Sequence, residues 1–196
     1  MTRPAVFLDR DGVLTELVPD PSTGTFESPL HPEDVALVPG VAAAAGQLAR
    51  AGYLLVGVTN QPAAAKRTVP LAVVEAVQAR VVALLAADGV VLDSWRICLH
   101  HPEGTDPELG RACDCRKPAP GLLLDAARDL DIDLASSWMI GDTDSDVQAG
   151  KAAGCRTFLI EVARSAHKRT ALVTPDRRAP DLAQAVTVLL SGGADC

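Results

Sequence analysis

The sequence predicts a three-layer, Rossmann-like α/β fold, in which helices cover both faces of a mostly parallel sheet. Short apolar runs alternate with longer segments of helical apolar spacing along the 196 residues, which is typical of parallel strands and their crossover helices. Polar and acidic side chains directly follow several apolar runs, at the sheet edge where ligands bind in such folds. The segment between Asp11 and Thr59 has room only for a flap and a helix, so we expect no large cap domain.

The first half of the chain contains two predicted strands and two predicted helices. An apolar strand is expected at residues 5–9, and a helix at 39–51, where a proline lies near the start and Gly52 follows the end. A buried strand follows at 53–59. A long helix is predicted at 70–88, because its apolar side chains recur at helical spacing.

The second half of the chain continues the same alternation, which again favours a sheet with helices between its strands. Pro180 directly precedes the last predicted helix, a position where proline often marks a helix start. The expected strands are 92–98, 137–141 and 155–161, and the expected helices are 120–130, 144–153 and 181–190.

Two irregular stretches interrupt this pattern. Residues 17–38 are rich in Pro, Ser, Thr and Gly, and residues 100–118 contain Pro, Gly, charges and cysteines. Loops of this length in a compact domain usually carry function or move. We expect a single domain over residues 1–191, with a loop at 98–115 that has cysteines at both ends, and a disordered tail at 192–196.

Composition and charge narrow the class of protein. Apolar residues make up 48% of the chain and the mean hydropathy is +0.17, so long disorder is not expected. The net charge of −7 argues against nucleic acid as a partner. No apolar run reaches the roughly 20 residues that cross a bilayer, and no signal peptide precedes the first strand. We therefore expect a cytoplasmic monomer without nucleic-acid or membrane partners.

Two aspartates end the first predicted strand. Asp9 and Asp11 follow an apolar run and are followed at once by Gly12. Two carboxylates at a ligand-binding strand edge suit a hard cation such as Mg²⁺ that bridges to a phosphate. The alternative is a pair of solvated acids beside a turn glycine, because short motifs often occur by chance.

Further polar residues are expected at the same edge. Thr59 and Asn60 end the second strand, where a hydroxyl and an amide can bind phosphate oxygens, although a helix cap or turn is the alternative. Lys117 precedes a predicted helix and can reach a phosphate as a point charge. The run at 141–146 contains three acids where a helix begins, more than capping requires.

These segments resemble the motifs of a known family. In this order, LDRDGV at 8–13, VTNQ at 58–61, the triplet RKP at 116–118 and GDTDSD at 141–146 are similar to the four motifs of the haloacid dehalogenase (HAD) phosphohydrolases. The resemblance covers about three quarters of the chain. Each motif alone is weakly specific, but the four together are specific.

The resemblance implies a role for each matching residue. Asp9 is then the nucleophile that forms an aspartyl-phosphate, and Asp11 is the acid and base that protonates the leaving alcohol and deprotonates the attacking water. Thr59 and Lys117 would hold the phosphoryl oxygens. Asp142 would complete the Mg²⁺ site with the Asp9 carboxylate and the Asp11 backbone carbonyl.

Two other acids of the fourth motif are expected to act less directly. Asp146 matches the last acid of the motif, and we expect it to lie outside the first coordination shell of the metal. Asp144 has no assigned role, and its expected position is a solvated helix cap.

A second constellation has the spacing of a metal site. Cys98 and His100 lie at one end of a loop and Cys113 and Cys115 at the other, which matches a structural tetrahedral Zn²⁺ site. Extended chain places residues 98 and 100 on one face, which favours His100 over the neighbouring His101. The alternative is three reduced cysteines with surface histidines.

The loop that carries these four residues indicates which subgroup of the HAD phosphohydrolases the chain resembles. The pattern CxHHP followed by CxCRKP resembles the capless, zinc-containing HAD phosphatases that act on heptose 1,7-bisphosphate or histidinol phosphate. The long stretch between the two ligand pairs resembles the heptose branch more closely. This resemblance implies a substrate-binding set of Asn60, Arg116 and Lys117, with Arg116 contacting a second phosphate or hydroxyls; a surface salt bridge is the alternative for Arg116.

The chain departs from that branch at residues 62–67 and 19–30, and both segments are expected beside the active-site mouth. Lys66 and Arg67 are expected there, either to bind a remote phosphate or as a solvated charged surface.

The resemblance thus implies a Mg²⁺-dependent, zinc-containing phosphomonoesterase of carbohydrate metabolism that removes the 7-phosphate of heptose 1,7-bisphosphate. The alternatives are a histidinol-phosphate, sugar or nucleotide phosphatase, a non-catalytic binding scaffold, and a phosphotransferase, which normally needs a cap that excludes water.

Overall fold

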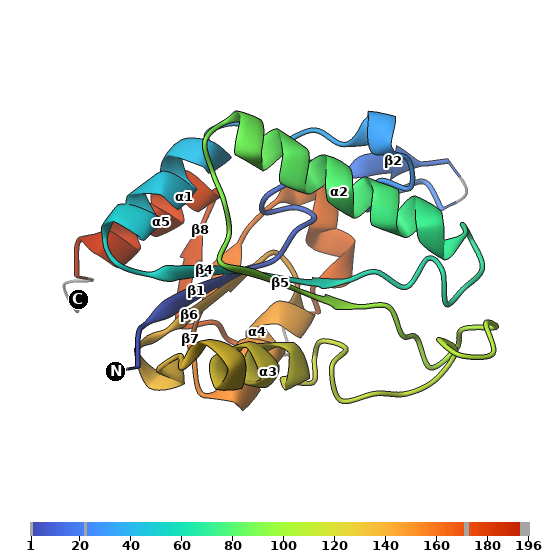
Figure 1. Cartoon of the computed structure of the whole chain (residues 1–196). Helices are drawn as coiled ribbons and strands as arrows, with labels where there is room; N and C mark the ends of the chain where they lie inside the picture. The colour runs from blue at the N-terminus through green and yellow to red at the C-terminus, as the bar shows by residue number, and fades with distance from the viewer. Residues whose placement is uncertain (1, 22, 171–172, 193–196) are drawn as a thin grey trace.

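The computed structural model describes residues 2–21, 23–170 and 173–192 (Figure 1). Its central sheet has six parallel strands in the order β5-β4-β1-β6-β7-β8. The predicted α/β class is confirmed. Of the tail expected at 192–196, residues 193–196 lie outside the described residues. The strands of this sheet are β1 Ala5–Leu8, β4 Leu54–Asn60, β5 Ser94–Cys98, β6 Trp138–Gly141, β7 Arg156–Ile160 and β8 Arg177–Ala179.

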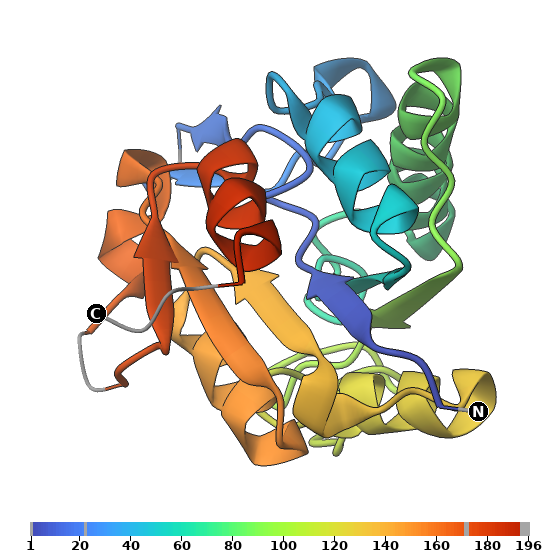
Figure 2. The same cartoon turned by 90° about the vertical axis from the view of Figure 1, so that its left-hand side faces the viewer.

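Helices cover both faces of the sheet, as Figure 2 shows. One face packs against α1, α2 and α5, and the other against α3 and α4. Side chains of β1 alternate between the two cores, because successive residues of a strand point to opposite faces: Val6 and Leu8 join the first core, and Ala5 and Phe7 the second. The helices are α1 Val41–Arg50, α2 Leu71–Ala87, α3 Gly121–Leu130, α4 Asp144–Ala153 and α5 Leu182–Leu190.

Every strand and helix predicted from the sequence is present, with ends within two residues of the prediction. The strand β8 was not predicted, because its three residues include two exposed arginines and form no apolar run. Two short 3-10 helices, η2 Leu134–Ser136 and η3 Ala163–Lys168, were also not predicted. Within the described ranges, no helix is both long enough and apolar enough to span a membrane.

The irregular stretch at 17–38 contains a small antiparallel hairpin, in a segment where the sequence left room only for a flap and a helix. It consists of β2 Val18–Asp20 and β3 Thr25–Glu27, and the 3-10 helix η1 Pro32–Asp34 follows it. Strands this short, with partly exposed side chains, leave no clear alternation in the sequence. The hairpin contacts η3, which lies after β7 in the chain.

The carboxyl ends of β1, β4 and β6 lie side by side. Leu8 at the end of β1 pairs in register with Gly57 of β4 and with Ile140 of β6. The polar residues that follow these strands therefore meet at one sheet edge, below the hairpin.

Candidate active site and metal centre

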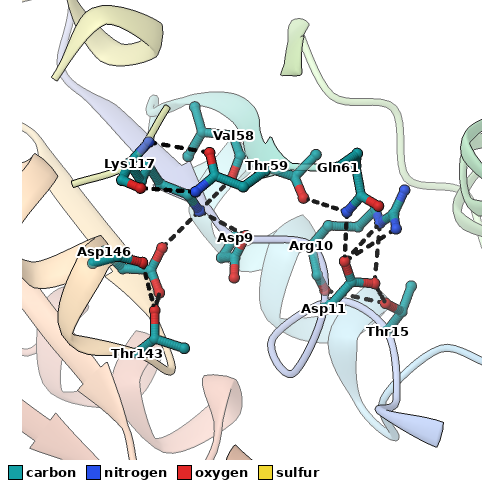
Figure 3. Close-up of polar contacts among 12 residues, drawn as sticks. Asp9, Arg10, Asp11, Thr15, Val58, Thr59, Gln61, Lys117, Thr143 and Asp146 are labelled. Carbon is teal, nitrogen blue, oxygen red and sulfur yellow. Dashed lines mark hydrogen bonds and ion pairs between the residues drawn. The ribbon is translucent and has the colours of Figure 1, made fainter. Parts of the chain in front are cut away.

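Asp9 lies at the centre of the polar edge. Its backbone N–H donates to the Ile140 carbonyl at 3.0 Å, which fixes the chain just after β1. Its carboxylate Oδ1 accepts a hydrogen bond from the Lys117 ammonium at 2.8 Å (Figure 3). Only 8% of the residue is exposed, so an approaching ligand meets a largely desolvated carboxylate.

Lys117 is held from several sides. Its Nζ also donates to the Val58 carbonyl at 2.8 Å and lies 2.6 Å from Asp146 Oδ1. Burial opposes the charged form, but Asp146 and Asp9 outweigh it and raise the pKa of Lys117. The lysine therefore remains a cation beside Asp9.

Asn60 is the neighbour that fixes the Lys117 backbone. Its side-chain Nδ2 donates to the Lys117 carbonyl at 2.9 Å, and its Oδ1 accepts from the Lys117 N–H at 3.1 Å. Asn60 also lines the active-site cavity. Its visible contacts position Lys117, and its expected contact with substrate stays a prediction.

Three buried carboxylates form a compact cluster. Ligand atoms of Asp9, Asp142 and Asp146 all lie within 4.8 Å of one another. Asp146 also accepts from the Thr143 N–H at 3.0 Å and from its hydroxyl at 2.6 Å, which closes a capping box at the start of α4. The position of Asp146 outside the first coordination shell of a metal stays a prediction, and the contact that the structure shows for its Oδ1 is with Lys117.

The electrostatics of this cluster suit a divalent cation. Burial and the neighbouring Asp146 raise the pKa of Asp142 to about 7. Burial also raises the pKa of Asp9 well above its ordinary value, although Lys117 opposes the rise. The buried Asp142 Oδ1 has no hydrogen-bond partner among the described residues. A hard cation with oxygen ligands would satisfy that atom and reduce the repulsion between the carboxylates, so the residues fit Mg²⁺.

Gly12 allows two chain segments to approach at this cluster. Its φ is +88°, and a Cβ at this position would overlap the Asp142 carboxylate. Both the positive φ and the close approach require glycine here. The sequence motif placed a glycine beside the acids, but only the fold shows which acid it accommodates.

Asp11 lies in a second polar network beside Asp9. Its carboxylate lies 3.0 Å from Arg10 NH2 and accepts from Gln61 Nε2 at 2.7 Å and from the Thr15 hydroxyl at 3.0 Å (Figure 3). Burial raises the pKa of Asp11, but Arg10 and Gln61 outweigh it and hold the pKa below its ordinary value. Gln61 also donates to the Thr59 hydroxyl at 2.8 Å.

Sequence reasoning missed Arg10 and Gln61. Arg10 has no exposed surface, and its NH1 donates to Gln78 of α2 at 3.1 Å. A buried arginine is rare unless it is paired, and the one available signal was its place between two aspartates. That place does not reveal which acid it binds.

The expected position of Asp144 as a solvated cap is wrong. The residue is 9% exposed, and its Oδ2 accepts from both the Thr170 N–H and the Thr170 hydroxyl at 2.7 Å. The segment after η3 folds back over the start of α4 and covers the carboxylate. Sequence spacing gave no sign of this contact, since the partners are 26 residues apart.

The four predicted zinc ligands lie together. Ligand atoms of Cys98, His100, Cys113 and Cys115 are all within 4.8 Å of one another. Cys115 Sγ lies 3.2 Å from the sulfurs of Cys98 and Cys113 and 3.5 Å from His100 Nδ1. In contrast, His101 Nδ1 accepts from the Glu103 N–H at 3.1 Å, so His100 is the histidine of this cluster.

The donor set of this cluster fits a closed zinc site. Three sulfurs and one imidazole nitrogen are a common tetrahedral set for structural Zn²⁺. Burial and the neighbouring thiols raise the pKa of Cys115, which disfavours crowded thiolates in the absence of a cation. A bound metal ion favours thiolates and would link the two ends of the loop.

A cavity of about 460 Å³ opens over Asp9. Its lining contains the acids and Lys117, together with residues of both segments that depart from the heptose branch, at 19–30 and 62–67. Arg116 and Lys66 are part of the lining, whereas Arg67 is not. The other lining residues include Asp20, Thr23, Glu27, Ser28, Leu30, Pro62, Ala63 and Lys168.

Comparisons with known proteins agree with this geometry. A family model described as HAD-hydrolase-like matches residues 114–185. The chain is 41% identical over 159 residues to the D-glycero-beta-D-manno-heptose-1,7-bisphosphate 7-phosphatase of Rhodopseudomonas palustris, covering 81% of this chain and 84% of that protein. The protein of the same name from Photorhabdus laumondii is 40% identical, with 80% and 79% covered.

A solved structure extends the similarity to the whole fold. The D,D-heptose 1,7-bisphosphate phosphatase from B. bronchiseptica, complexed with magnesium and phosphate, superposes with a TM-score of 0.77 at 30% identity. The match covers 96% of this chain and 99% of that one. The chain therefore belongs to the heptose bisphosphate phosphatase family of the HAD-like hydrolases.

Proposed function

We propose that this phosphatase removes the 7-phosphate of D-glycero-D-manno-heptose 1,7-bisphosphate, with Asp9 as the nucleophile. The observation that carries the assignment of Asp9 is its position: a largely buried carboxylate at the cavity floor, 2.8 Å from the Lys117 ammonium. The substrate follows from the similarity to relatives that bear this name.

In the proposed first step, an oxygen of Asp9 attacks phosphorus, and the bond to the leaving sugar oxygen breaks. Thr59 and Lys117 bind the equatorial oxygens, where negative charge accumulates. Asp11 protonates the leaving oxygen; because Arg10 and Gln61 hold its pKa low, it takes up that proton only when the anionic phosphate binds beside it. The product of this step is an aspartyl-phosphate on Asp9 and a free alcohol.

In the second step, water attacks the aspartyl-phosphate and Asp11 accepts the proton from it. Inorganic phosphate leaves, and Asp9 is restored. Mg²⁺ would be held by the Asp9 and Asp142 carboxylates and the Asp11 backbone carbonyl, where its charge reduces the repulsion between nucleophile and phosphate. Gln61, which contacts both Asp11 and Thr59, keeps the proton-transfer group next to the phosphate-binding hydroxyl.

We also propose that Arg116 and Lys66 bind the phosphate that is not removed. Both line the cavity, and Arg116 is partly buried, with its NH1 3.4 Å from the His100 carbonyl. Burial, Arg116 and Lys66 together lower the pKa of His101. Two cationic groups therefore lie near one another beside the cavity, as binding of a second anion requires.

The remaining proposals concern the whole chain. We propose a structural Zn²⁺ on Cys98, His100, Cys113 and Cys115, and one domain over residues 1–191 that acts as a cytoplasmic monomer. We propose no nucleic-acid or membrane partner, in keeping with the net charge of −7. Light scattering coupled to gel filtration tests the oligomeric state.

Phosphate release from a substrate panel tests the function. The panel contains both anomers of heptose 1,7-bisphosphate, fructose 1,6-bisphosphate, histidinol phosphate and a nucleotide monophosphate, each with Mg²⁺ and with EDTA. We expect Mg²⁺-dependent release that strongly favours a heptose anomer. A preference for another ester would contradict the substrate, and no release from any ester would contradict the catalytic role.

A further inference from the structure

An ion pair forms part of the cavity wall between the hairpin and the segment after β7. Glu27 ends β3 and Lys168 ends η3, and Lys168 Nζ donates to Glu27 Oε2 at 2.6 Å. Both residues line the cavity that contains Asp9. Their side chains are 38% and 31% exposed, so both are accessible to a ligand without being fully solvated.

The position of Lys168 is fixed relative to the acids. Arg169 NH1 donates to the Asp142 carbonyl at 3.1 Å and to the Ser165 hydroxyl at 3.0 Å. Thr170 then binds Asp144. Before the lysine, the Ser165 hydroxyl donates to the Asp142 carbonyl at 3.3 Å. The chain on both sides of Lys168 is thus fastened to the segment that carries Asp142 and Asp144, which holds the ammonium group beside the cavity.

The chemistry of this pair differs from that of Arg116 and Lys66, which line the same cavity. An ammonium group has three donors, of which one is used by Glu27. The Oε1 atom of Glu27 also lies 3.3 Å from His167 Nε2 and 3.4 Å from the Thr25 hydroxyl, which leaves the carboxylate with acceptor capacity for a ligand. Donor and acceptor therefore lie side by side with no net charge. Such a pair suits neutral hydroxyls, which both donate and accept, whereas the basic groups near His101 suit an anion.

We propose that the Glu27–Lys168 pair binds hydroxyl groups of the sugar and determines substrate specificity. Lys168 donates to one hydroxyl oxygen, and Glu27 accepts from a neighbouring hydroxyl, while the phosphate to be removed lies against Asp9. This inference rests on the proposed function, because it requires a polyhydroxylated leaving group.

Arg164 provides the matched control for a purely structural role. It joins the same hairpin to the same 3-10 helix, since its guanidinium lies 4.9 Å from the ring centre of Phe26 in β3. Its Nη1 also donates to Glu16, just before β2, at 2.8 Å. Arg164 is not among the residues that line the cavity. Its loss therefore weakens hairpin attachment without removing a cavity-facing group.

The experiment measures kcat/KM for Lys168→Met, Glu27→Gln and Arg164→Met on two esters: heptose 1,7-bisphosphate, and phenyl phosphate, which has no hydroxyls. For the Lys168 and Glu27 variants we expect a loss of about 10- to 100-fold on the heptose, the size of a hydrogen bond to a charged group. On phenyl phosphate we expect a loss of less than about threefold from the same variants. Arg164→Met should change both esters equally and slightly.

Equal losses on both esters for Lys168→Met would overturn the proposal, as would a heptose-selective loss in Arg164→Met. Failure of the proposed function gives a different result, because the unmodified protein would then release no phosphate from the heptose. Circular dichroism and thermal melting of each variant establish that it is folded before the kinetic comparison is made.

Discussion

Lys117 Nζ lies 2.6 Å from Asp146 Oδ1 and 2.8 Å from Asp9 Oδ1, so one buried cation joins the proposed nucleophile to the start of α4. The two acids orient the lysine and keep its ammonium group beside the Asp9 carboxylate, where we propose that the phosphate binds. Asp146, which ends the fourth motif, therefore positions the cation that the third motif supplies.

We predict that Lys117→Met lowers kcat by about 10²- to 10³-fold, because charge on the phosphoryl oxygens loses a fixed cation. Asp146→Asn should lower kcat less, since the lysine remains but is held less firmly. Steady-state phosphate release measures both. Lys151→Met is the control, because Lys151 forms an exposed ion pair with Asp176 on the surface, and a comparable loss there would contradict the assignment.

A second prediction concerns the buried Arg10. Arg10→Met leaves the Asp11 carboxylate buried without its cation, and we expect the free energy of unfolding to fall by about 3–5 kcal/mol. Urea denaturation measures the change. Arg128→Met is the comparison, because its exposed pair with Asp125 is expected to contribute at most about 1 kcal/mol. Similar values for the two variants would show that Arg10 is not needed to compensate Asp11.

Comparing Gly12→Ala with Gly89→Ala separates the cost of backbone strain from damage to the cluster of Asp9, Asp142 and Asp146. A left-handed backbone at a non-glycine residue costs about 1–2 kcal/mol, and the new Cβ would also overlap Asp142. Gly89→Ala is the matched control for backbone strain alone, since Gly89 has a φ of +78° and nothing within 4 Å of the added Cβ. We expect both variants to melt earlier and only Gly12→Ala to lose activity and Mg²⁺ affinity. Equal activities would contradict the role of Gly12.

The zinc proposal predicts a measurable metal content. Cys113→Ser should lose the bound zinc and expose the loop at 98–115 to proteolysis, because only three ligands remain. Elemental analysis and limited proteolysis measure this. Cys155→Ala is the control, since Cys155 is buried in the core and lies outside the cluster; it should destabilise the protein and retain the metal. Zinc that persists in Cys113→Ser would exclude this ligand set.

Asp176 gives a prediction about pH. Burial raises its pKa, but the Thr157 hydroxyl and N–H, at 2.7 and 2.8 Å, outweigh burial and hold the pKa below its ordinary value of 3.8. The folded state therefore favours the ionised form. Its stabilisation is present above pH 3.8 and is lost as the pH falls through the lowered pKa.

We expect Asp176→Ala to lower the melting temperature by about 2–4 °C at pH 7. This difference from the unmodified protein should shrink as the pH falls below 3.8. Thr157→Val, which removes one donor to Asp176, should lose part of the same pH dependence. Melting curves from pH 7 down to pH 3 measure this, and a pH-independent difference would contradict it.

Much of the fold could be predicted because its signals are local. The apolar runs of β1 and β4 and the spacing in α2 each lie within one continuous segment, so period and length identify them. The hairpin β2–β3 and the strand β8 could not be predicted in this way, because each strand has three residues and lacks a buried face of its own.

By itself, the sequence determined which chemical groups are present and at which strand ends they lie: Asp9 and Asp11 after β1, Thr59 at the end of β4, and the acids after β6. Parallel strands bring their carboxyl ends to one edge, so these positions follow from local pattern and topology. The paired spacing of cysteines likewise predicted that Cys98, His100, Cys113 and Cys115 lie together.

Only the tertiary structure decided which side chain meets which. Arg10 binds Asp11, Asp144 is covered by Thr170, and Lys168 meets Glu27 from 141 residues away. Such partners depend on how distant loops pack over the sheet edge, and no local periodicity encodes that packing. The burial that raises or lowers each pKa arises in the same way, since charges lose their water only when the whole fold closes around them.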